Sequence, residues 1–523
     1  MKQKKLLAAA LSLLLLTCCA ENPDSDIIVH KDMEKLIGEA QQTGETKAEV
    51  ADLQQNDRYT ADFEHESLRV KVHADAEIEI PDVDRLSVYH VQKQQFTQDT
   101  ADTLLDSLIG DRPLYDSELL ELRTKNDLLP EIADTRERYA AGWENSGFYT
   151  EEDFESEMQS LLDLLQSEYD YLPNEISYAD HPSDGRLHPV RELYERNPAA
   201  MQYHNAFYTK WFQRNPEGNI MDCITDGADG QYCRLQVINS PDMASSISFF
   251  RTPLSASYAS LTADAVLTVN PSAKRYGLPE YFRLDFDDMN GNWTELPDDS
   301  AALSQEDAQA QAEALFEKLG IEGFSFYEGG LFAERVWLYK DMYLPYHEGD
   351  TREFYYHTCR ILRYFRNLDG CFLLPGGGKQ GDRIDEYHSS TWADEIIEVR
   401  VNDSGIVGFN YVSPLSVLEK TVSDAALKPF SEIQAAFEKM APMMTAHEIE
   451  NFRVELDIDR VQLCYVRVSE KDSFDTGYAV PVWAFSGKRK LYNDLNENFD
   501  TQEGTFVYVN AVDGSVIAPG KGY

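Results

Sequence analysis

Short segments in which apolar and polar residues alternate recur along this chain, and they constrain its fold more than any other feature. Clear examples are residues 68–72, Leu-Arg-Val-Lys-Val, and residues 76–80, Ala-Glu-Ile-Glu-Ile. Because successive side chains of a strand point to opposite faces of a sheet, this alternation predicts strands with one face buried and one face in water. We therefore expect antiparallel sheets, beginning near Tyr59.

Amphipathic helical segments lie between the expected strands. The stretch from about 115 to 215 is mostly helical in pattern and rich in acidic residues, and its clearest helix runs from Thr150 to about Tyr169. Apolar residues at helical spacing predict further helices at 97–109, 304–319 and 431–440. Other strands are expected at 86–91, 223–286, 324–343, 354–366, 396–411, 452–456, 461–468 and 505–509. These patterns predict an α+β fold of several antiparallel sheet-plus-helix units.

Three of the expected helices begin in the same way, at Phe96-Thr97, Leu303-Ser304 and Phe430-Ser431. In each, an apolar residue precedes a hydroxyl residue that can cap the helix, and the apolar residue can pack back on the first turns. The spacings of 207 and 127 residues exclude a solenoid of fixed period. They allow related units, each a helix laid across a small antiparallel sheet. The alternative, that surface helices generally begin this way, stays open.

The N-terminal residues have the composition of an export signal. Three lysines precede an apolar run from Leu6 to Leu16, which is shorter than the roughly 20 residues that a spanning helix needs. The following Leu16-Thr17-Cys18-Cys19 resembles the bacterial lipobox. This resemblance implies cleavage before Cys19 and lipidation of its thiol by a diacylglycerol. The alternative is an ordinary secretory peptide whose cysteines are incidental.

A lipid anchor at Cys19 organises the expected domain layout. Residues 1–18 would be the lipoprotein signal peptide, and the polar, acidic residues 19–57 would be a tether. An N-terminal α+β domain with the helical insert is expected at 58–220, and a C-terminal α+β region at 221–523. No later segment approaches spanning length, so we expect this part outside the cell membrane, on its extracellular face.

The chain is strongly acidic, with 92 Asp and Glu against 47 Lys and Arg and a formal charge of −45. Loss of the three lysines of the signal peptide changes this charge to −48. Nucleic acid is excluded as a partner, because its binding depends on Lys and Arg that neutralise phosphates. Anionic lipid headgroups should also repel the body, which leaves the lipid as the main membrane contact.

Several short segments resemble known envelope proteins. The C-terminal residues 480–485 and 506–517 resemble the ending of PepSY-type units and of regulators of envelope sensor kinases, and residues 303–308 are similar to the start of a PepSY helix. The whole layout, notably residues 59–63 and 88–91, resembles an uncharacterised lipoprotein family of Gram-positive gut bacteria. The resemblance implies a non-catalytic envelope module that binds or inhibits a partner, such as a sensor kinase or a peptidase.

Five cysteines follow the lipobox, at positions 223, 233, 359, 371 and 464. An odd, sparse set is not a disulfide framework. Cys223 and Cys233 flank a turn-rich stretch, so one hairpin disulfide and a set of buried free thiols both stay open.

Two loops carry partial ligand-binding motifs. Gly376–Gly381 matches the dinucleotide pattern G-x-G-x-x-G, but the polar residues behind it do not open the helix that this pattern requires, so a surface loop is favoured. Residues 494–500 alternate Asp and Asn like a calcium loop, with Phe499 where such loops need Gly. The acidic turn at 285–291 is likewise out of register. Weak calcium binding stays open for both turns.

Other candidate chemistry is weaker still. His357 and Cys359 lack the second ligand pair that a zinc site needs, and the common serine hydrolase motifs are absent from the sequence. Tyr478, Trp483 and Phe485 could face a ligand, although an aromatic-rich strand more often belongs to a core. We therefore expect no catalytic, cofactor-binding or metal-binding residues. The expected function is non-catalytic binding or regulation in the cell envelope, and the alternatives are a solute-binding lipoprotein of a transporter and a secreted hydrolase without a recognisable motif.

Overall fold

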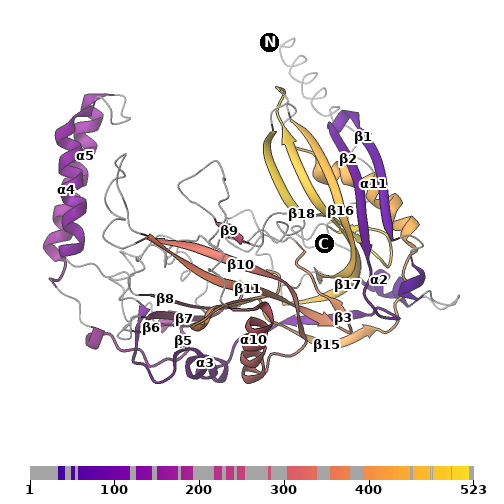
Figure 1. Ribbon diagram of the computed structural model, residues 1–523, viewed down its shortest axis with the longest axis horizontal. Coiled ribbons are helices and arrows are strands. Elements are labelled where there is room, and N and C mark those ends of the chain that lie inside the picture. The colour runs from indigo at the N-terminus through magenta and orange to yellow at the C-terminus, as the bar shows by residue number, and fades with distance from the viewer. Residues whose placement is uncertain are drawn as a thin grey trace, which may run out of the picture.

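Two large β-sheets form the body of the protein in the computed structural model (Figure 1). One has eight strands and the other eleven in the part of the chain that the structure describes. The described residues are 33–41, 49–53, 57–117, 125–143, 150–174, 178–192, 217–225, 231–240, 244–253, 281–283, 303–337, 354–376, 393–447, 452–470, 473, 475–495 and 498–517.

The eight-stranded sheet combines strands from both ends of the chain. Its order is β1-β2-β16-β17-β18-β19, and β3 pairs with both β15 and β17. All of its strand pairs are antiparallel except β2 with β16. The strands are β1 (Arg58–His65), β2 (Val70–Glu79), β3 (Val88–Lys93), β15 (Leu415–Val422), β16 (Arg453–Ser469), β17 (Thr476–Tyr492), β18 (Asn498–Asn510) and β19 (Val516–Ile517).

The eleven-stranded sheet is built from the middle of the chain. Its order is β4-β6-β7-β8-β14-β13-β11-β10-β9, with β5 beside β6 and β12 beside β11. Among the strands that the structure describes here, only β9 and β10 pair in parallel. The strands are β4 (Leu114–Asp116), β5 (His188–Pro189), β6 (Asn219–Thr225), β7 (Gln231–Asn239), β8 (Ser246–Pro253), β9 (Tyr281–Arg283), β10 (Phe324–Trp337), β11 (Phe354–Leu368), β12 (Cys371–Phe372), β13 (Ile396–Asn402) and β14 (Gly405–Val412).

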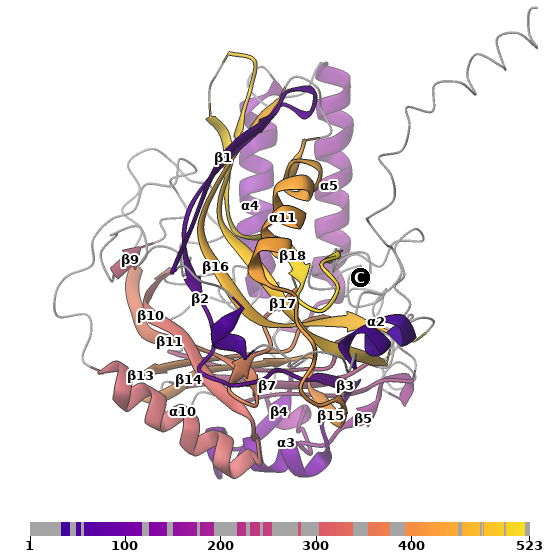
Figure 2. The ribbon, with the colours of Figure 1, turned by 90° about the vertical axis from the view of Figure 1, so that its right-hand side faces the viewer.

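Three helices each precede an antiparallel meander, which confirms the predicted α+β fold of sheet-plus-helix units. The first two meanders, β4 to β8 and β10 to β14, share the eleven-stranded sheet and meet where β8 pairs with β14. The third, β16 to β19, belongs to the eight-stranded sheet, and its helix packs on that sheet (Figure 2). The three helices are α3 (Gln98–Leu104), which continues as a π-helical turn (Leu105–Ile109), α10 (Gln305–Leu319) and α11 (Phe430–Thr445).

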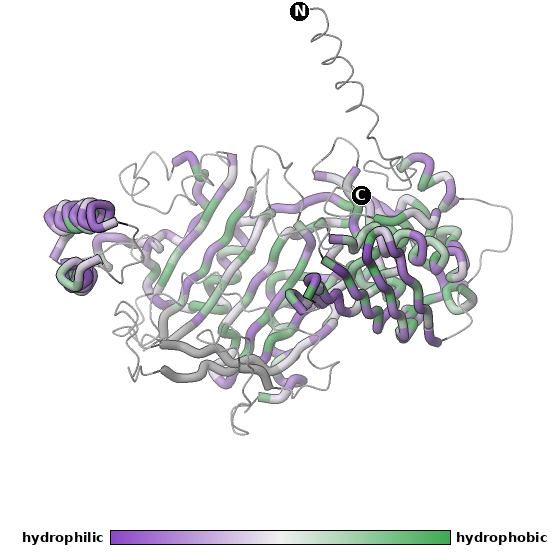
Figure 3. Tube along the Cα trace, turned by 90° about the horizontal axis from the view of Figure 1, so that it is seen from above, coloured by the Kyte–Doolittle hydropathy of each residue, from purple (hydrophilic) through white to green (hydrophobic). Residues whose placement is uncertain are grey.

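The predicted helical segment around 115–215 contains a helical hairpin, α4 (Lys125–Ala141) and α5 (Glu151–Tyr171). We call these two helices the arm. They lie side by side and project from one end of the body in both views (Figures 1 and 3). Other helical elements in the described ranges are α2 (Met33–Ala40) and the short 3₁₀ turns η1 (Val50–Asp52), η2 (Glu66–Leu68) and η6 (Tyr178–Asp180).

Strand alternation creates separate apolar cores on the sheet faces, and Figure 3 shows hydrophobic and hydrophilic residues alternating along the strands. One core fills the space between α11 and the eight-stranded sheet, where Phe437 stacks on Phe485 with ring centroids 4.0 Å apart. A second lies between the eleven-stranded sheet and the helices α3 and α10. A third covers the other face of the eight-stranded sheet and includes Leu36 of α2.

Two of the three predicted helix caps are confirmed. The hydroxyl oxygens of Thr97 and Ser304 accept hydrogen bonds from backbone amides three residues further on. The third prediction is wrong, because α11 begins at Phe430 and Pro429 occupies the capping position. The Phe430 amide donates to the carbonyl oxygen of Leu53 at 2.8 Å, so the backbone near η1 satisfies this helix end.

The predicted domain layout differs from the observed one. The boundary expected between residues 220 and 221 falls inside β6, and strands β1 to β3 join the sheet that the C-terminal strands build. The described parts of the expected tether also pack on the body, since Leu36 and Leu53 are buried in the cores of the eight-stranded sheet. Pairing between segments far apart in sequence leaves no local pattern, which is why these contacts were not predicted.

The two strands expected at 452–456 and 461–468 form a single strand, β16. Its register shifts between Ile458 and Arg460, and this irregularity explains the break in the sequence pattern. Gly487 of β17 lies opposite, where an added Cβ atom would lie 1.9 Å from the carbonyl oxygen of Asp457. Only glycine permits so close an approach.

Candidate functional site

A row of polar side chains crosses the eleven-stranded sheet on the face opposite α3 and α10. The strand register aligns these residues across seven strands, and the strand neighbours of all of them except Glu328 belong to the core on the helix-covered face. Because side chains alternate between faces, the aligned residues share the other face. We call this the polar row, and it comprises Asp222, Gln236, Ser248, Asn410, Glu398, Arg363 and Glu328.

One half of the polar row is a chain of alternating charges. Glu398 accepts a hydrogen bond from Nε of Arg363 at 3.3 Å and from Nη2 of Arg400 at 3.1 Å. Arg363 also donates through Nη1 to Glu328 at 3.1 Å. The side chain of Glu398 is only 11% exposed, so these bonds replace the water that its carboxylate would otherwise need.

The other half has the same construction on a smaller scale. Asp222 accepts two hydrogen bonds from Arg234, at 2.9 and 2.6 Å, and a third from Nε2 of Gln236 at 2.7 Å. The two-pronged geometry fixes the guanidinium orientation as well as its position. Each carboxylate of the row therefore has a cationic partner within the sheet.

A second polar cluster joins the two sheets. The carboxylate of Glu395 accepts hydrogen bonds from Arg366, from the hydroxyl of Tyr411 and from the amide of Leu415, which begins β15. Burial, together with the charge of Glu395, raises the pKa of Tyr411 far above its usual value. The cluster therefore connects the two sheets and has a structural role.

Close to this junction, Asp369 lies in the turn between β11 and β12 with a φ of 52°. Its carboxylate accepts hydrogen bonds from Lys420 and Tyr89, which come from β15 and β3 of the eight-stranded sheet. Hydrogen bonds from these two groups lower the pKa of Asp369. Burial and the hydrogen bond to Asp369 raise the pKa of Tyr89 to about 12. This trio also connects the sheets.

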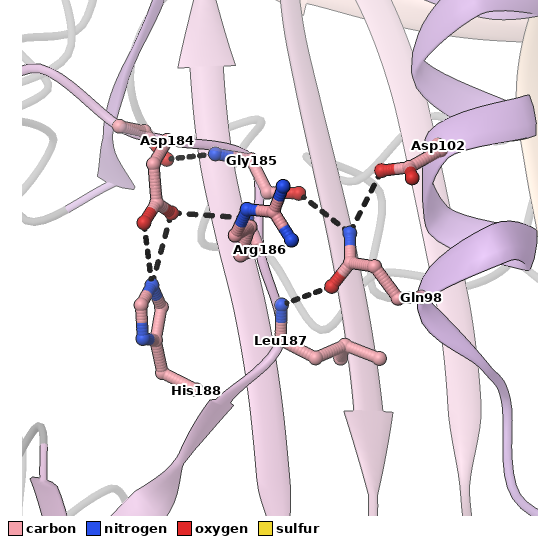
Figure 4. A network of polar contacts seen from close by, with 8 residues as sticks. Gln98, Asp102, Asp184, Gly185, Arg186, Leu187 and His188 are labelled. Atoms are coloured by element: carbon pink, nitrogen blue, oxygen red, sulfur yellow. Dashed lines mark hydrogen bonds and ion pairs between the residues drawn. The ribbon is translucent and has the colours of Figure 1, made fainter.

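A further network fastens a loop to the start of α3 (Figure 4). The side-chain amide of Gln98 donates to Asp102 and to the carbonyl of Gly185, and its oxygen accepts from the amide of Leu187. In the same loop, His188 contacts Asp184 at 2.9 Å. Burial opposes ionisation of Asp184, but the hydrogen bonds from His188 and a backbone amide outweigh it and lower the pKa of this carboxyl group. The loop is thereby held in one position.

The sequence-predicted aromatic candidates lie mostly in the core. Trp483 and Phe485 are fully buried beneath α11, which confirms their interpretation as core residues. Tyr478 is half-buried on the opposite face, and its ring stacks on His90 with centroids 4.8 Å apart. Cys19, the predicted lipidation site, lies outside the described residues.

The cysteines after the lipobox are all buried free thiols. The hairpin register places Cys223 opposite Leu235, so Cys233 is not its partner across the strands, and the alternative of a hairpin disulfide is overturned. Burial raises the pKa of Cys371 to about 12, and it raises those of Cys223 and Cys464 further. Such thiols are poor nucleophiles at neutral pH.

Much of the predicted ligand loops lies outside the described residues. In the glycine-rich loop these are Gly377–Gly381, in the calcium-like loop at 494–500 they include Asn496, and the turn at 285–291 lies outside them completely. In the described part of the other acidic turn, Asp494 forms an ion pair with Arg69 at 3.1 Å, and Asp500 accepts from Gln502. The side chain of His357 is outside the described residues, and Cys359 lies in a small apolar cluster. Within the described part of the chain, no three His, Cys, Asp or Glu residues gather as metal ligands would.

The polar row itself was missed by sequence reasoning. The alternation in single strands, such as Ile-Ile-Glu-Val-Arg in β13, indicates that Glu398 and Arg400 share one face. It does not indicate which strands lie beside them, and the row exists only through that pairing. The signal that the sequence did offer was a charged residue, such as Glu398, between apolar neighbours on one strand.

No protein-family model matches the chain, and no curated protein matches its sequence. Among solved structures, the chain is similar to the crystal structure of an uncharacterised protein from Eubacterium rectale, determined at 1.45 Å. The two share 12% sequence identity with a TM-score of 0.41, and the match covers 93% of this chain and 99% of that chain. Within the described residues, no helix combines the length and apolar character that crossing a membrane requires.

Proposed function

We propose that this chain is a lipoprotein held on the extracellular face of the cell membrane, where it has a non-catalytic binding or regulatory role toward an envelope protein. The N-terminal lipobox-like sequence ending at Cys19 supports the anchor. The polar row supports recognition, since it offers paired charges across a broad sheet face rather than a single reactive group.

The observation that carries this proposal is the mutual pairing of the partly exposed charges along the polar row. A general acid or base must be free to contact its substrate within hydrogen-bond distance. Glu398 instead lies between two arginines, and Asp222 accepts from Arg234 and Gln236. The thiols of Cys223, Cys371 and Cys464 have raised pKa values, opposite to the shift that activates a nucleophile.

The two alternatives fit less well. A solute-binding lipoprotein of a transporter needs two α/β lobes of alternating parallel strands and helices. The described strands instead form antiparallel meanders, apart from the pairs β2–β16 and β9–β10. A secreted hydrolase needs an activated nucleophile or an acid–base pair, whereas the carboxylates of the polar row are each paired with an arginine.

In-cell crosslinking tests the binding role. A photo-reactive residue in place of Ser248, at the centre of the polar row, should capture one membrane protein reproducibly. The same residue in place of the exposed Thr60 on β1 is the matched control and should not capture it. Empty crosslinks at Ser248 from a folded, surface-exposed protein would contradict the proposal and favour small-molecule binding or hydrolysis.

Membrane fractionation tests the anchor separately. The Cys19→Ala variant lacks the thiol that lipid would modify, so it should leave the membrane fraction or remain as an uncleaved precursor. Two buried acyl chains make membrane residence stable because each methylene contributes about 0.8 kcal/mol. Unchanged, fully processed membrane retention of Cys19→Ala would refute lipidation at this residue.

A further inference from the structure

The arm has a small core of its own. Leu128 and Ile132 of α4 pack with Leu165 of α5, and the amide of Lys125 donates to the carbonyl of Pro173 at the base of the hairpin. Figures 1 and 3 show both helices projecting from the body rather than lying along it. Much of the surface of α5 therefore faces away from α4.

The side of α5 opposite α4 carries a stripe without charges. Its members recur at intervals of four, four, three and four residues, which places them on one face of a helix. All are exposed, and two are large apolar residues: Leu164 is 63% exposed and Tyr171 is 84% exposed. The stripe comprises Ser156, Ser160, Leu164, Ser167 and Tyr171.

Carboxylates border this stripe on both sides. Helical spacing places Asp163 and Asp170 along one border, and Glu157 and Glu168 along the other. Gln159 donates to Asp163 at 2.8 Å and Gln166 donates to Asp170 at 3.0 Å, so one border repeats the same polar pair after seven residues. The whole helix has eight acidic residues and no basic residue.

The size and charge of the side chains on this face of α5 determine which kind of partner can bind there. Small serines permit close approach of a second helix, and the exposed leucine and tyrosine offer apolar area to bury. The flanking carboxylates require Lys or Arg opposite them. A second copy of this acidic chain, an anionic lipid surface and a nucleic acid would all place negative charge against negative charge.

We propose that the outer face of α5 docks a basic amphipathic helix of a protein partner. The apolar seam of that helix packs on Leu164 and Tyr171, and its flanking basic residues pair with the carboxylates. The inference rests on the proposed binding function and names the chemistry of the partner.

A designed pair of peptides tests this docking directly. The first is a fluorescent 21-residue helix with a leucine seam and flanking lysines, and the second has the same composition with leucines and lysines scrambled. Fluorescence anisotropy with the full mature chain should show at least tenfold tighter binding of the seam peptide. General attraction of lysines to an acidic protein acts equally on both peptides and cancels in this comparison.

Two variants locate the site. Leu164→Ser with Tyr171→Ser should remove the difference between the peptides, and folding is preserved because both side chains are exposed. The matched control is Leu495→Ser with Phe499→Ser, which removes comparable exposed apolar area near the β17–β18 turn and should keep the difference. Circular dichroism verifies that both variants are folded.

Neutralising the borders tests the charge requirement. Glu157→Gln with Asp163→Asn and Asp170→Asn should weaken seam-peptide binding about tenfold, as expected for three exposed ion pairs. Equal binding of both peptides to the wild type, or a difference that survives Leu164→Ser with Tyr171→Ser, would overturn the docking site. Crosslinking from Ser248 that still captures a membrane protein would then leave the proposed function standing and reject only this inference.

Discussion

Replacement of Glu395 is the most informative perturbation of the structure. Its side chain is 1% exposed and precedes β13. It accepts hydrogen bonds from Nε and Nη2 of Arg366 at 2.6 and 2.9 Å, from the Tyr411 hydroxyl at 2.9 Å and from the Leu415 amide at 2.9 Å. One carboxylate therefore connects β11, β14 and the first residue of β15.

The expected cost follows from these four bonds. Glu395→Gln keeps the shape of the side chain but leaves the guanidinium of Arg366 buried without a counter-charge. The new NH₂ group, itself a donor, would also lie against groups that donate hydrogen bonds in the wild type. Loss of one partner of a buried ion pair costs about 3–5 kcal/mol of unfolding free energy. Tyr411→Phe removes a single bond to the same carboxylate and should cost about 1.5–3 kcal/mol.

Urea unfolding followed by far-UV circular dichroism measures these differences. The double replacement Arg366→Met with Glu395→Met should cost less than the sum of the two single replacements, because it leaves no unpaired charge. A Glu395→Gln variant within about 1 kcal/mol of the wild type would refute the reasoning, as that is the scale of an ordinary hydrogen bond. Strict additivity of the two methionine replacements would refute it as well.

Three further predictions follow from caps, thiols and pH. Ser304→Ala should lower the unfolding free energy by about 1 kcal/mol, because its hydroxyl caps α10, whereas Ser431→Ala should change it by less than about 0.5 kcal/mol. Thermal unfolding of the two variants distinguishes these outcomes, and equal losses would contradict the observed caps. Cys223 and Cys233 should resist thiol reagents in the folded protein and react as two free thiols after unfolding; a bridged peptide in non-reducing mapping would contradict this. The lowered pKa of Asp369 stabilises the fold above its unfolded pKa of about 3.9 and ceases to do so as pH falls through the lower folded pKa. The difference in melting temperature between the wild type and Asp369→Asn should therefore stay constant above about pH 5 and narrow as the pH falls below about 3.9. A difference that is unchanged in the acid range would contradict the assignment.

Local elements of this fold were predictable because their causes are local. The alternating segments 68–72 and 76–80 overlap β2, and the hydroxyl residues Thr97 and Ser304 cap the helices that follow them. The start of α11 was not predictable from the same pattern. Its first amide is satisfied by the carbonyl of Leu53, which is distant in sequence and leaves no mark near Ser431.

The polar row shows the same limit at the level of a site. Its two ends, Asp222 and Glu328, belong to strands at nearly opposite ends of the sheet. Asp222 gains Arg234 when β6 pairs with β7, Glu398 gains Arg363 when β13 pairs with β11, and the two halves join where β8 pairs with β14. With so many acidic residues in the chain, no single carboxylate stands out in the sequence. Strand order, which the sequence does not encode locally, decides which charges meet.

The parallel pairing of β2 with β16 has a consequence for how the chain is made. Val70 lies opposite Val454, so the N-terminal hairpin keeps an unpaired edge until nearly the whole chain has been synthesised. Until β16 is made, this edge can pair with strands of other chains. Folding is also slow, because the two strands are far apart in the sequence. A chain truncated before β16 would therefore leave β2 without its partner strand. We expect proteases to cut β1 and β2 of this chain as readily as its new C-terminal end.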